Sequence, residues 1–246
     1  MNSYARYGVI NLTRVSLIVL YGRLMPQKEH TFTKFDDDLH AIRDHILEMG
    51  GMVEKQFKQS LTALFESNAA VAKQVIDQDY SVNQLEVMID NLCVTAIARQ
   101  QPAASDLQSI IISTKVVVHL ERIGDEAKKI ARIAERLSYQ KRLRKQHPSS
   151  VHHAAEVAQH NLSAVMESYA LLDTIAASKL LHSEDTTEEK FNIVFRALVQ
   201  SMTDDPRTIS SSLEILFVAK AIEHIENHIK HIAKLVIEAS NRYSEI

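Results

Sequence analysis

The sequence predicts an all-α protein made of two tandem three-helix bundles, and three observations lead to this prediction. The 246 residues include only five glycines and four prolines, so turns should be few and the elements long. After Phe35, apolar residues recur at spacings of three and four, which is the period of a helix, and no alternating β-pattern competes. The helix expected at 110–137 also recurs in pattern at 212–236, which indicates an internal repeat.

The first bundle is expected over residues 32–140. Its first helix begins near Phe35, where Asp36 to Asp38 supply an N-terminal cap and an acidic first turn, and Asn68 ends it. The second helix ends in the segment 100–105, which contains Pro102. The third is the long helix ending near Leu137. The stripe expected in the core of the first helix comprises Leu39, Ile42, Ile46, Met49, Val53, Phe57, Leu61 and Leu64.

The second bundle is expected over residues 151–243, after a basic linker at 141–150. Its first helix is expected to extend to Ile175, its second covers Phe191 to Met202, and its third starts at Pro206, where proline is tolerated. Before the first bundle, residues 1–31 form an N-terminal extension. Its apolar run is too short to span a bilayer, and we predict Met25 as the native start, the alternative being a mobile tail.

Composition narrows the class of protein. The apolar content of 46% and charged content of 24% are ordinary for a globular chain. The formal net charge of −3 gives no basic character for binding nucleic acid, and the cluster at 141–145 is small and lies in the linker. The single cysteine, Cys93, has no internal partner for a disulfide, which favours a reducing compartment.

Pairs of acidic side chains four positions apart are the candidate functional groups. Glu121 and Asp125 lie one turn apart beside an apolar patch, where they repel each other unless an arginine or a hard cation lies between them. Such groups on converging bundle helices can form carboxylate metal sites. The alternative is that they are solvated helix faces. The related pairs are Glu86 with Asp90, Asp79 with Asn83, Glu184 with Glu188, and Glu223 with Asn227.

Four segments together carry a resemblance to a known family. They read MGGMVE (49–54), LEVMID (85–90), RQQPAASDL (99–107) and LERIGDEAKKI (120–130). In this order they are similar to the PhoU family of phosphate-signalling accessory proteins, over about residues 32–243. The resemblance implies tandem three-helix bundles without enzymatic activity, which bind iron, zinc or another divalent metal through Glu/Asp-x-x-x-Asp motifs.

The resemblance also implies partners and a role. It implies a cytoplasmic homodimer, peripheral to the membrane through its partners, that contacts the ATPase of the phosphate ABC transporter and a sensor histidine kinase. It implies negative regulation of phosphate uptake and of the phosphate-starvation response, the Pho regulon. The surface around Glu121 and Asp125, ordered by bound metal, is then expected to be one face of the interaction module.

The second half departs from the family motif. The first half keeps Glu121, Arg122 and Asp125, but the corresponding second-half segment has His224 in place of the arginine and Asn227 in place of the aspartate. Asparagine is a neutral and weaker ligand. The imidazoles at 224, 228 and 231 share one helix face and could bind a softer metal, with Glu223, His224, Asn227 and His228 as candidate ligands. The alternative is a second copy that has lost metal binding.

The sequence lacks the motifs of two classes of enzyme. A carboxylate-bridged metal oxidase needs Glu-x-x-His on paired helices, and the sequence has no such motif. There is also no glycine-rich phosphate loop for nucleotide hydrolysis. A metal-free helical adaptor, or a divergent PhoU paralogue with other partners, remains the alternative to the metal-organised regulator.

Overall fold

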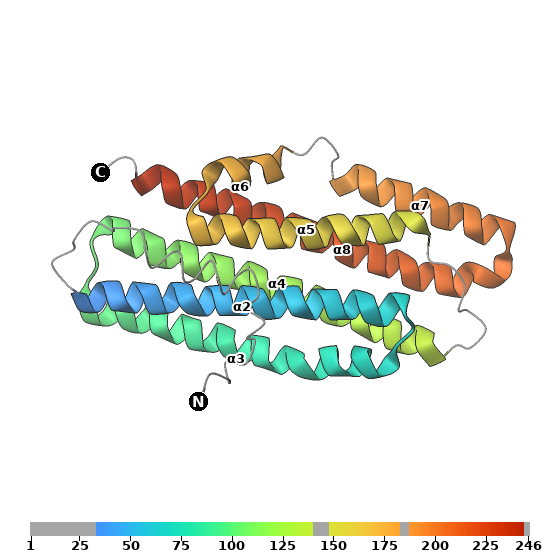
Figure 1. The fold of residues 1–246 in the computed structure, drawn as a ribbon, viewed down its shortest axis with the longest axis horizontal. Helices are drawn as coiled ribbons and strands as arrows, with labels where there is room; N and C mark the ends of the chain where they lie inside the picture. Colours follow the sequence, from blue (N-terminus) through green and yellow to red (C-terminus); the bar gives the residue numbers. More distant parts are fainter. Residues whose placement is uncertain (1–32, 140–147, 183–186, 244–246) are drawn as a thin grey trace, which may run out of the picture.

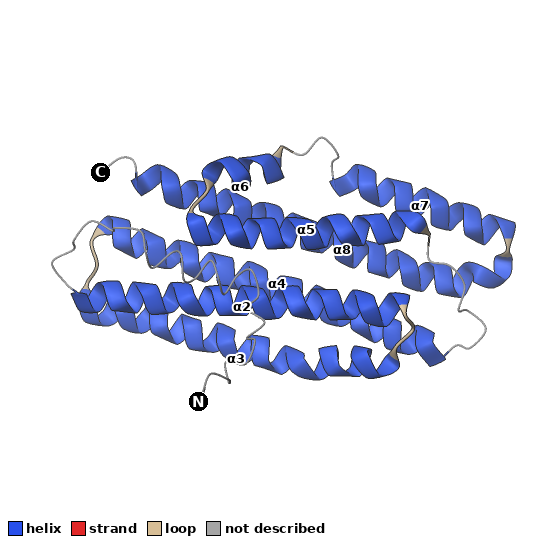
Figure 2. Ribbon diagram, viewed as in Figure 1, coloured by secondary structure: helices blue, strands red, loops and turns tan. Residues whose placement is uncertain are grey.

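The computed structural model describes residues 33–139, 148–182 and 187–243. The prediction about Met25, the basic cluster at 141–145 and the candidate residue Glu184 lie outside the described residues. Every described element is helical, and the all-α prediction with two three-helix bundles is confirmed (Figures 1 and 2). None of the described helices is both long and apolar enough to cross a bilayer.

The first bundle consists of α2 (Thr33–Phe65), α3 (Ala69–Gln100) and α4 (Ala104–Tyr139). Asn68 begins α3 by accepting hydrogen bonds at its side chain from the backbone N–H groups of Ala70 and Val71. Gln101 ends the helix in the left-handed conformation, with φ 46°. α2 starts before the predicted Phe35, so Asp36 lies in its first turn and does not cap it. All of the predicted α2 stripe is buried except Leu39, which packs on the core from its edge.

The second bundle consists of α5 (Ser149–Leu171), α6 (Thr174–Leu181), α7 (Thr187–Asp204) and α8 (Ile209–Tyr243). Its middle member is divided, because α6 and α7 together take the place that α3 alone has in the first bundle. The helix α5 also includes Ser149 and Ser150, which belong to the predicted linker at 141–150.

The prediction that Ile175 belongs to the first helix of this bundle is wrong. Leu172 adopts a left-handed conformation with φ 52° and ends α5. Asp173 then caps α6, accepting hydrogen bonds from the backbone N–H groups of Ile175 and Ala176. Ile175 therefore lies in the first turn of α6 and is 70% exposed, so it contributes little to the core.

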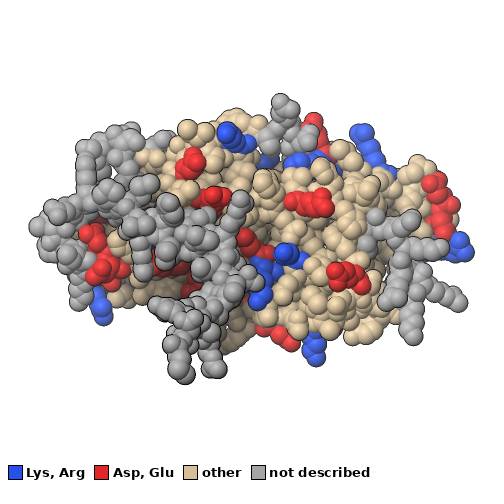
Figure 3. All heavy atoms as spheres, viewed as in Figure 1, with Lys and Arg blue, Asp and Glu red and all other residues tan. Residues whose placement is uncertain are grey.

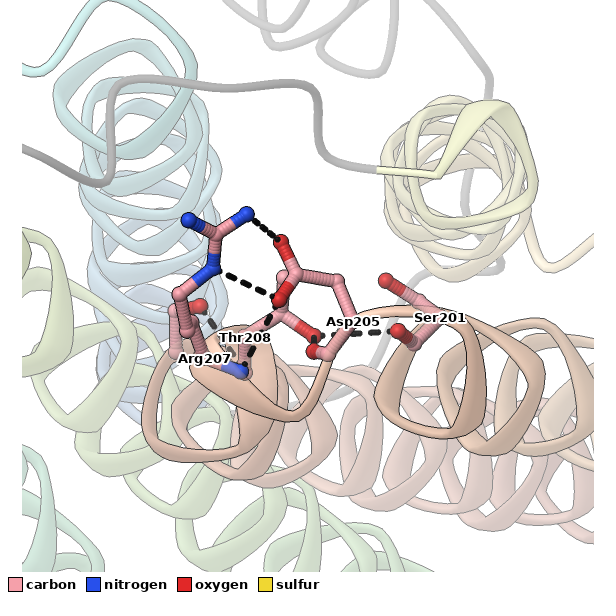
Figure 4. A network of polar contacts seen from close by, with 5 residues as sticks. Ser201, Asp205, Arg207 and Thr208 are labelled. Atoms are coloured by element: carbon pink, nitrogen blue, oxygen red, sulfur yellow. Dashed lines mark hydrogen bonds and ion pairs between the residues drawn. The ribbon is translucent and has the colours of Figure 1, made fainter.

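A compact polar turn joins α7 to α8 through the short 3₁₀ helix η1 (Pro206–Thr208) (Figure 4). Asp205 accepts a hydrogen bond from the backbone N–H of Arg207 and forms an ion pair with its guanidinium. The hydroxyl of Thr208 donates to the backbone carbonyls of Ser201 and Asp205. These contacts satisfy backbone groups at the end of α7 and reverse the chain direction.

The two bundles lie side by side and share one hydrophobic core (Figure 1). The main contact between them is α4 against α8, with α2 against α5 beside it. Arg136 pairs with Glu214, Glu126 with His224, and His119 with His228. Because the α4 number falls as the α8 number rises, these two helices are antiparallel. We call this contact the α4–α8 seam.

Candidate functional site: an acidic cluster on α3 and α4

Four carboxylates from two neighbouring helices form the acidic cluster, which we define as Glu86 and Asp90 of α3 with Glu121 and Asp125 of α4. They act on one another electrostatically: besides burial, Asp90 and Asp125 raise the pKa of Glu86, and Asp125 and Glu86 raise the pKa of Glu121. Asp90 is exposed and the other three are partly buried. The side chain of Glu121 is only 16% exposed.

The cluster carries negative charge that it does not fully neutralise. Burial raises the pKa of Glu121, and the nearby carboxylates of Asp125 and Glu86 raise it further. The pKa of Glu86 is raised by burial and then by Asp90. Arg122 lowers both pKa values, with its Nε 3.5 Å from Glu121 Oε2, but its side chain is 60% exposed and its charge is largely screened.

Asp79, a further predicted ligand, serves another purpose in the structure. It is 2% exposed; its Oδ1 accepts a hydrogen bond from Gln56 Nε2 at 3.0 Å, and its Oδ2 pairs with Lys128 Nζ at 2.5 Å. Both oxygens thus have partners within the bundle, and breaking such a buried pair would be costly. Gly124 lies over the same spot, where a Cβ would be 3.1 Å from Gln56 Oε1.

The chemistry of the acidic cluster suits a hard divalent cation, because carboxylate oxygens are the ligands such cations prefer and their charge is uncompensated. Over the described residues, however, no three donors from histidine, cysteine, aspartate or glutamate are close enough together to hold a metal. The cluster as built therefore supplies the charge and the ligand type. Side-chain rotation or water would have to complete the coordination.

The corresponding part of the second bundle is neutralised from within. Glu223 pairs with Lys220, whose Nζ lies 2.7 Å from Glu223 Oε2 and 5.0 Å from the centre of the Phe191 ring. The buried Glu226 accepts hydrogen bonds from Asn161 Nδ2 at 3.0 and 3.3 Å. The Nζ of Lys190, on α7, lies 4.0 Å from Glu226 Oε2 with a side chain only 15% exposed. Amines and an amide here surround the acids.

The other predicted second-half ligands are not brought to Glu223. Asn227 and Glu188 are exposed. His224 and His228 instead contact α4: His224 Nδ1 lies 3.1 Å from Glu126 Oε1, and His228 Nδ1 lies 3.1 Å from His119 Nδ1. The second-half candidates are therefore divided between the interior of their own bundle and the α4–α8 seam.

Sequence reasoning missed the buried acids Glu126 and Glu226 and the lysine beside the second of them. Glu126 is 7% exposed and pairs with Lys129 Nζ at 2.8 Å. The spacing of Glu126 and Lys129 along one helix was a usable signal. The approach of Lys190 to Glu226 left no such signal in the sequence, because the two residues are on different helices.

An open face of α3 borders the acidic cluster. Its lining consists only of uncharged side chains, which are Tyr80, Asn83, Gln84, Val87, Met88, Asn91, Leu92 and Thr95. Tyr80, Val87 and Val94 repeat at seven-residue intervals along α3 and are 59–67% exposed. Glu86 and Asp90 immediately precede Val87 and Asn91 of this lining. Among the described residues on the face seen in Figure 3, by contrast, acidic and basic side chains are interspersed.

A tandem helical-bundle protein with an acidic cluster at its first repeat is the class that these features define. The chain belongs to the PhoU family: the PhoU domain model matches it twice, at residues 46–134 and 151–236. The PhoU homologue of Pseudomonas aeruginosa, called a phosphate-specific transport system accessory protein, is 38% identical over 208 residues, covering 85% of this chain and 86% of the relative. The Escherichia coli protein of that name is 34% identical over 212 residues, with the same coverages.

Solved structures agree with this assignment. The crystal structure of PhoU from Pseudomonas aeruginosa is 37% identical, with a TM-score of 0.79, covering 84% of this chain and 99% of that one. The crystal structure of the phosphate transport system regulatory protein PhoU from Streptococcus pneumoniae is 20% identical, with a TM-score of 0.76. The match covers 84% of this chain and 96% of that one. At this identity the likeness supports the fold alone.

Proposed function

We propose that this protein is an accessory protein of a phosphate-specific transport system that restrains phosphate uptake and the phosphate-starvation response. Relatives at 34–38% identity are named as accessory proteins of that system, which supports the role. The observation that carries the proposal is the acidic cluster on α3 and α4, which the first repeat keeps while its second-half counterpart is neutralised by lysines.

The protein would act by binding rather than by catalysis. The uncharged open face of α3 and the adjoining acidic cluster offer one continuous surface for a folded partner. Its proposed partner is the ATPase of the phosphate ABC transporter, with the sensor histidine kinase as a second partner. The protein would work in the cytoplasm, reach the membrane only through these partners, and form a homodimer.

A divalent cation at the acidic cluster is part of this proposal. Glu86, Glu121 and Asp125 would hold it, and the cation would offset the burial and the mutual repulsion that raise the pKa values of Glu86 and Glu121. One such site per chain is proposed, because Lys190 and Lys220 already supply the positive charge in the second bundle. The competing candidate is a metal-free adaptor, favoured by the lack of three converging donors among the described residues.

A complementation experiment tests the role. A strain lacking its own copy would carry the wild-type protein, the E121A/D125A variant, or a control with two carboxylates removed elsewhere, D37A/E156A. We expect the E121A/D125A strain to express a phosphate-starvation reporter in high phosphate and the control strain to keep it repressed. Repression by the E121A/D125A protein would show that the acidic cluster is not needed for signalling.

Elemental analysis of the same purified proteins distinguishes the two candidates. Iron, zinc or manganese retained by the wild type and lost from the E121A/D125A variant would place the metal at the acidic cluster. Loss of repression without any metal in either protein would favour the metal-free adaptor, with Glu121 and Asp125 acting as direct contacts to the partner.

A further inference from the structure

Three histidines meet at the α4–α8 seam, away from the acidic cluster's own carboxylates. We call His119 of α4 with His228 and His231 of α8 the seam histidines. The Nδ1 atoms of His119 and His228 are 3.1 Å apart. The His119 ring stacks on that of His231, with centroids 5.0 Å apart and planes inclined by 4°, and lies 5.3 Å from the His228 ring. The centroids of His228 and His231 are 6.5 Å apart.

The spacing of the first two histidines is that of two ligands on one metal ion. A tetrahedral zinc ion holds each imidazole nitrogen at about 2.0–2.1 Å, which places two such nitrogens roughly 3.3 Å apart. The observed 3.1 Å is close to this spacing. The two rings come from different helices of different bundles, so their approach reflects how the seam is packed and not a spacing along one helix.

The two facing rings are shielded by the helices that carry them. His119 and His228 are partly buried between α4 and α8. Both imidazole nitrogens would face the ion once the proton between the two Nδ1 atoms had moved to an outer ring nitrogen. His231 is exposed, so the site has access to solvent.

We propose that His119 and His228 form a binding site for a borderline transition-metal ion, of the class of Zn²⁺, Ni²⁺ or Cu²⁺, which joins the two bundles across the α4–α8 seam. In the structure two donors face each other, in keeping with the absence of a three-donor group over the described residues. Water or a rotated His231 would complete the coordination. Without metal, the two Nδ1 atoms are within hydrogen-bond distance and share one proton.

This site differs from the acidic cluster in the metal it takes. Imidazole ligands suit zinc, nickel and copper, whereas carboxylates suit manganese, magnesium and calcium. The two sites would also join different helices. A metal at the acidic cluster would act within the first bundle, between α3 and α4. A metal at the seam histidines would fix α4 against α8 and so couple the two repeats.

Titration of the tag-free protein with Zn²⁺ by calorimetry tests the proposal. The variants are H119Q, H228Q and H231Q, with H160Q as the control because His160 is an exposed α5 histidine outside the seam. We expect H119Q and H228Q to weaken Zn²⁺ binding at least tenfold and H160Q to leave it within twofold. Equal affinity in the wild type and H119Q, or no binding by the wild type, would overturn the proposal.

A spectroscopic readout covers the case in which a variant folds poorly. The electron paramagnetic resonance spectrum of the wild-type protein with one equivalent of Cu²⁺ should show coupling to at least two imidazole nitrogens. In the folded E121Q/D125N variant that coupling should persist, because the acidic cluster takes no part. An oxygen-only spectrum in the wild type, or loss of the nitrogen coupling in E121Q/D125N, would place the metal elsewhere.

Discussion

Gly50 and Gly51 are neighbours in α2 with opposite surroundings. A Cβ added to Gly50 would lie 2.3 Å from the terminal methyl carbon of Met166 on α5, and within 3.3 Å of two further atoms of that side chain. At Gly51 nothing lies within 4 Å. Met166 is 1% exposed and has little space into which it could move. Gly50 therefore lies where α2 of the first bundle packs closely against α5 of the second, and Gly51 does not.

The substitutions G50A and G51A should therefore differ in their effect on stability, with G50A the less stable variant. Alanine is favoured over glycine inside a helix by about 1 kcal/mol, so G51A should raise the free energy of unfolding by roughly that amount. In G50A the same gain is offset by overpacking, which costs about 1–3 kcal/mol. Urea denaturation of both variants measures the difference. A G50A protein as stable as G51A would mean that Met166 rearranges at no cost.

At the scale of the element, the contact of α2 with α5 also contains an incompletely satisfied acid. The Oε1 atom of Glu54 is buried and has no hydrogen-bond partner. Burial raises the pKa of Glu54, and a hydrogen bond with the side chain of Ser163 on α5 partly opposes this. Nearby, Arg43 donates a hydrogen bond to the backbone carbonyl of Ala170 near the end of α5. The two helices are thus joined by one favourable polar contact and one costly carboxylate.

The variant E54Q should be more stable than the wild type at neutral pH. A carboxyl group whose pKa is raised on folding binds its proton more tightly in the folded state, so its ionised form costs stability at pH values above that pKa. The cost falls as the pH is lowered through the raised pKa toward the ordinary value of 4.5. Because the amide of the variant is never ionised, E54Q avoids the cost of desolvating a charge, and a gain of about 1 kcal/mol would raise Tm by roughly 2–4 °C.

Thermal unfolding from pH 8 to pH 4.5 measures this effect. The advantage of E54Q over the wild type should shrink as the pH falls, while the control E156Q, at an exposed carboxylate of α5, should show no such trend. An E54Q protein destabilised by a constant amount at all pH values would mean that the hydrogen bond with Ser163 outweighs the desolvation of the charge.

The helices could be predicted because each one carries its own periodic signal. In α4 the apolar residues spaced by threes and fours from Ile112 to Ala134 are buried, since burying one face of a long helix is a local property of its sequence. The break at Leu172 could not be predicted from that period, because apolar residues continue across it. The capping residue Asp173 was the available signal, and its preference for a helix start outweighs the apolar pattern.

At the scale of the whole molecule, the site was only partly predictable. Glu121 and Asp125 could be found because their spacing lies within one helix, and Glu86 with Asp90 for the same reason. The partners of Asp79, Glu226 and His228 could not be found, because Lys128, Lys190 and His119 each approach from another helix. Those contacts depend on the register between helices, which a single sequence does not specify.

The asymmetry between the repeats leads to a prediction for the stability of the whole chain. In buffer containing a chelator, the variant E121Q/D125N should unfold at a higher temperature than the wild type, because neutral amides remove the repulsion that burial intensifies in the acidic cluster. The matching second-half variant E223Q should unfold at a lower temperature, since it leaves Lys220 without its carboxylate partner.

Adding Mn²⁺ should then raise the unfolding temperature of the wild type relative to that of E121Q/D125N, because only an intact acidic cluster would bind the ion. A ligand that binds the folded state alone stabilises it by about 2.7 kcal/mol at a hundred times its Kd, so the wild type and E223Q should gain several degrees of Tm while E121Q/D125N gains none. Mn²⁺ is the suitable probe because it favours carboxylate ligands over imidazole ligands. If E121Q/D125N responded to Mn²⁺ as the wild type does, the ion would be bound outside the acidic cluster. If neither responded, the first repeat would need a protein partner, and not a cation, to neutralise its carboxylates.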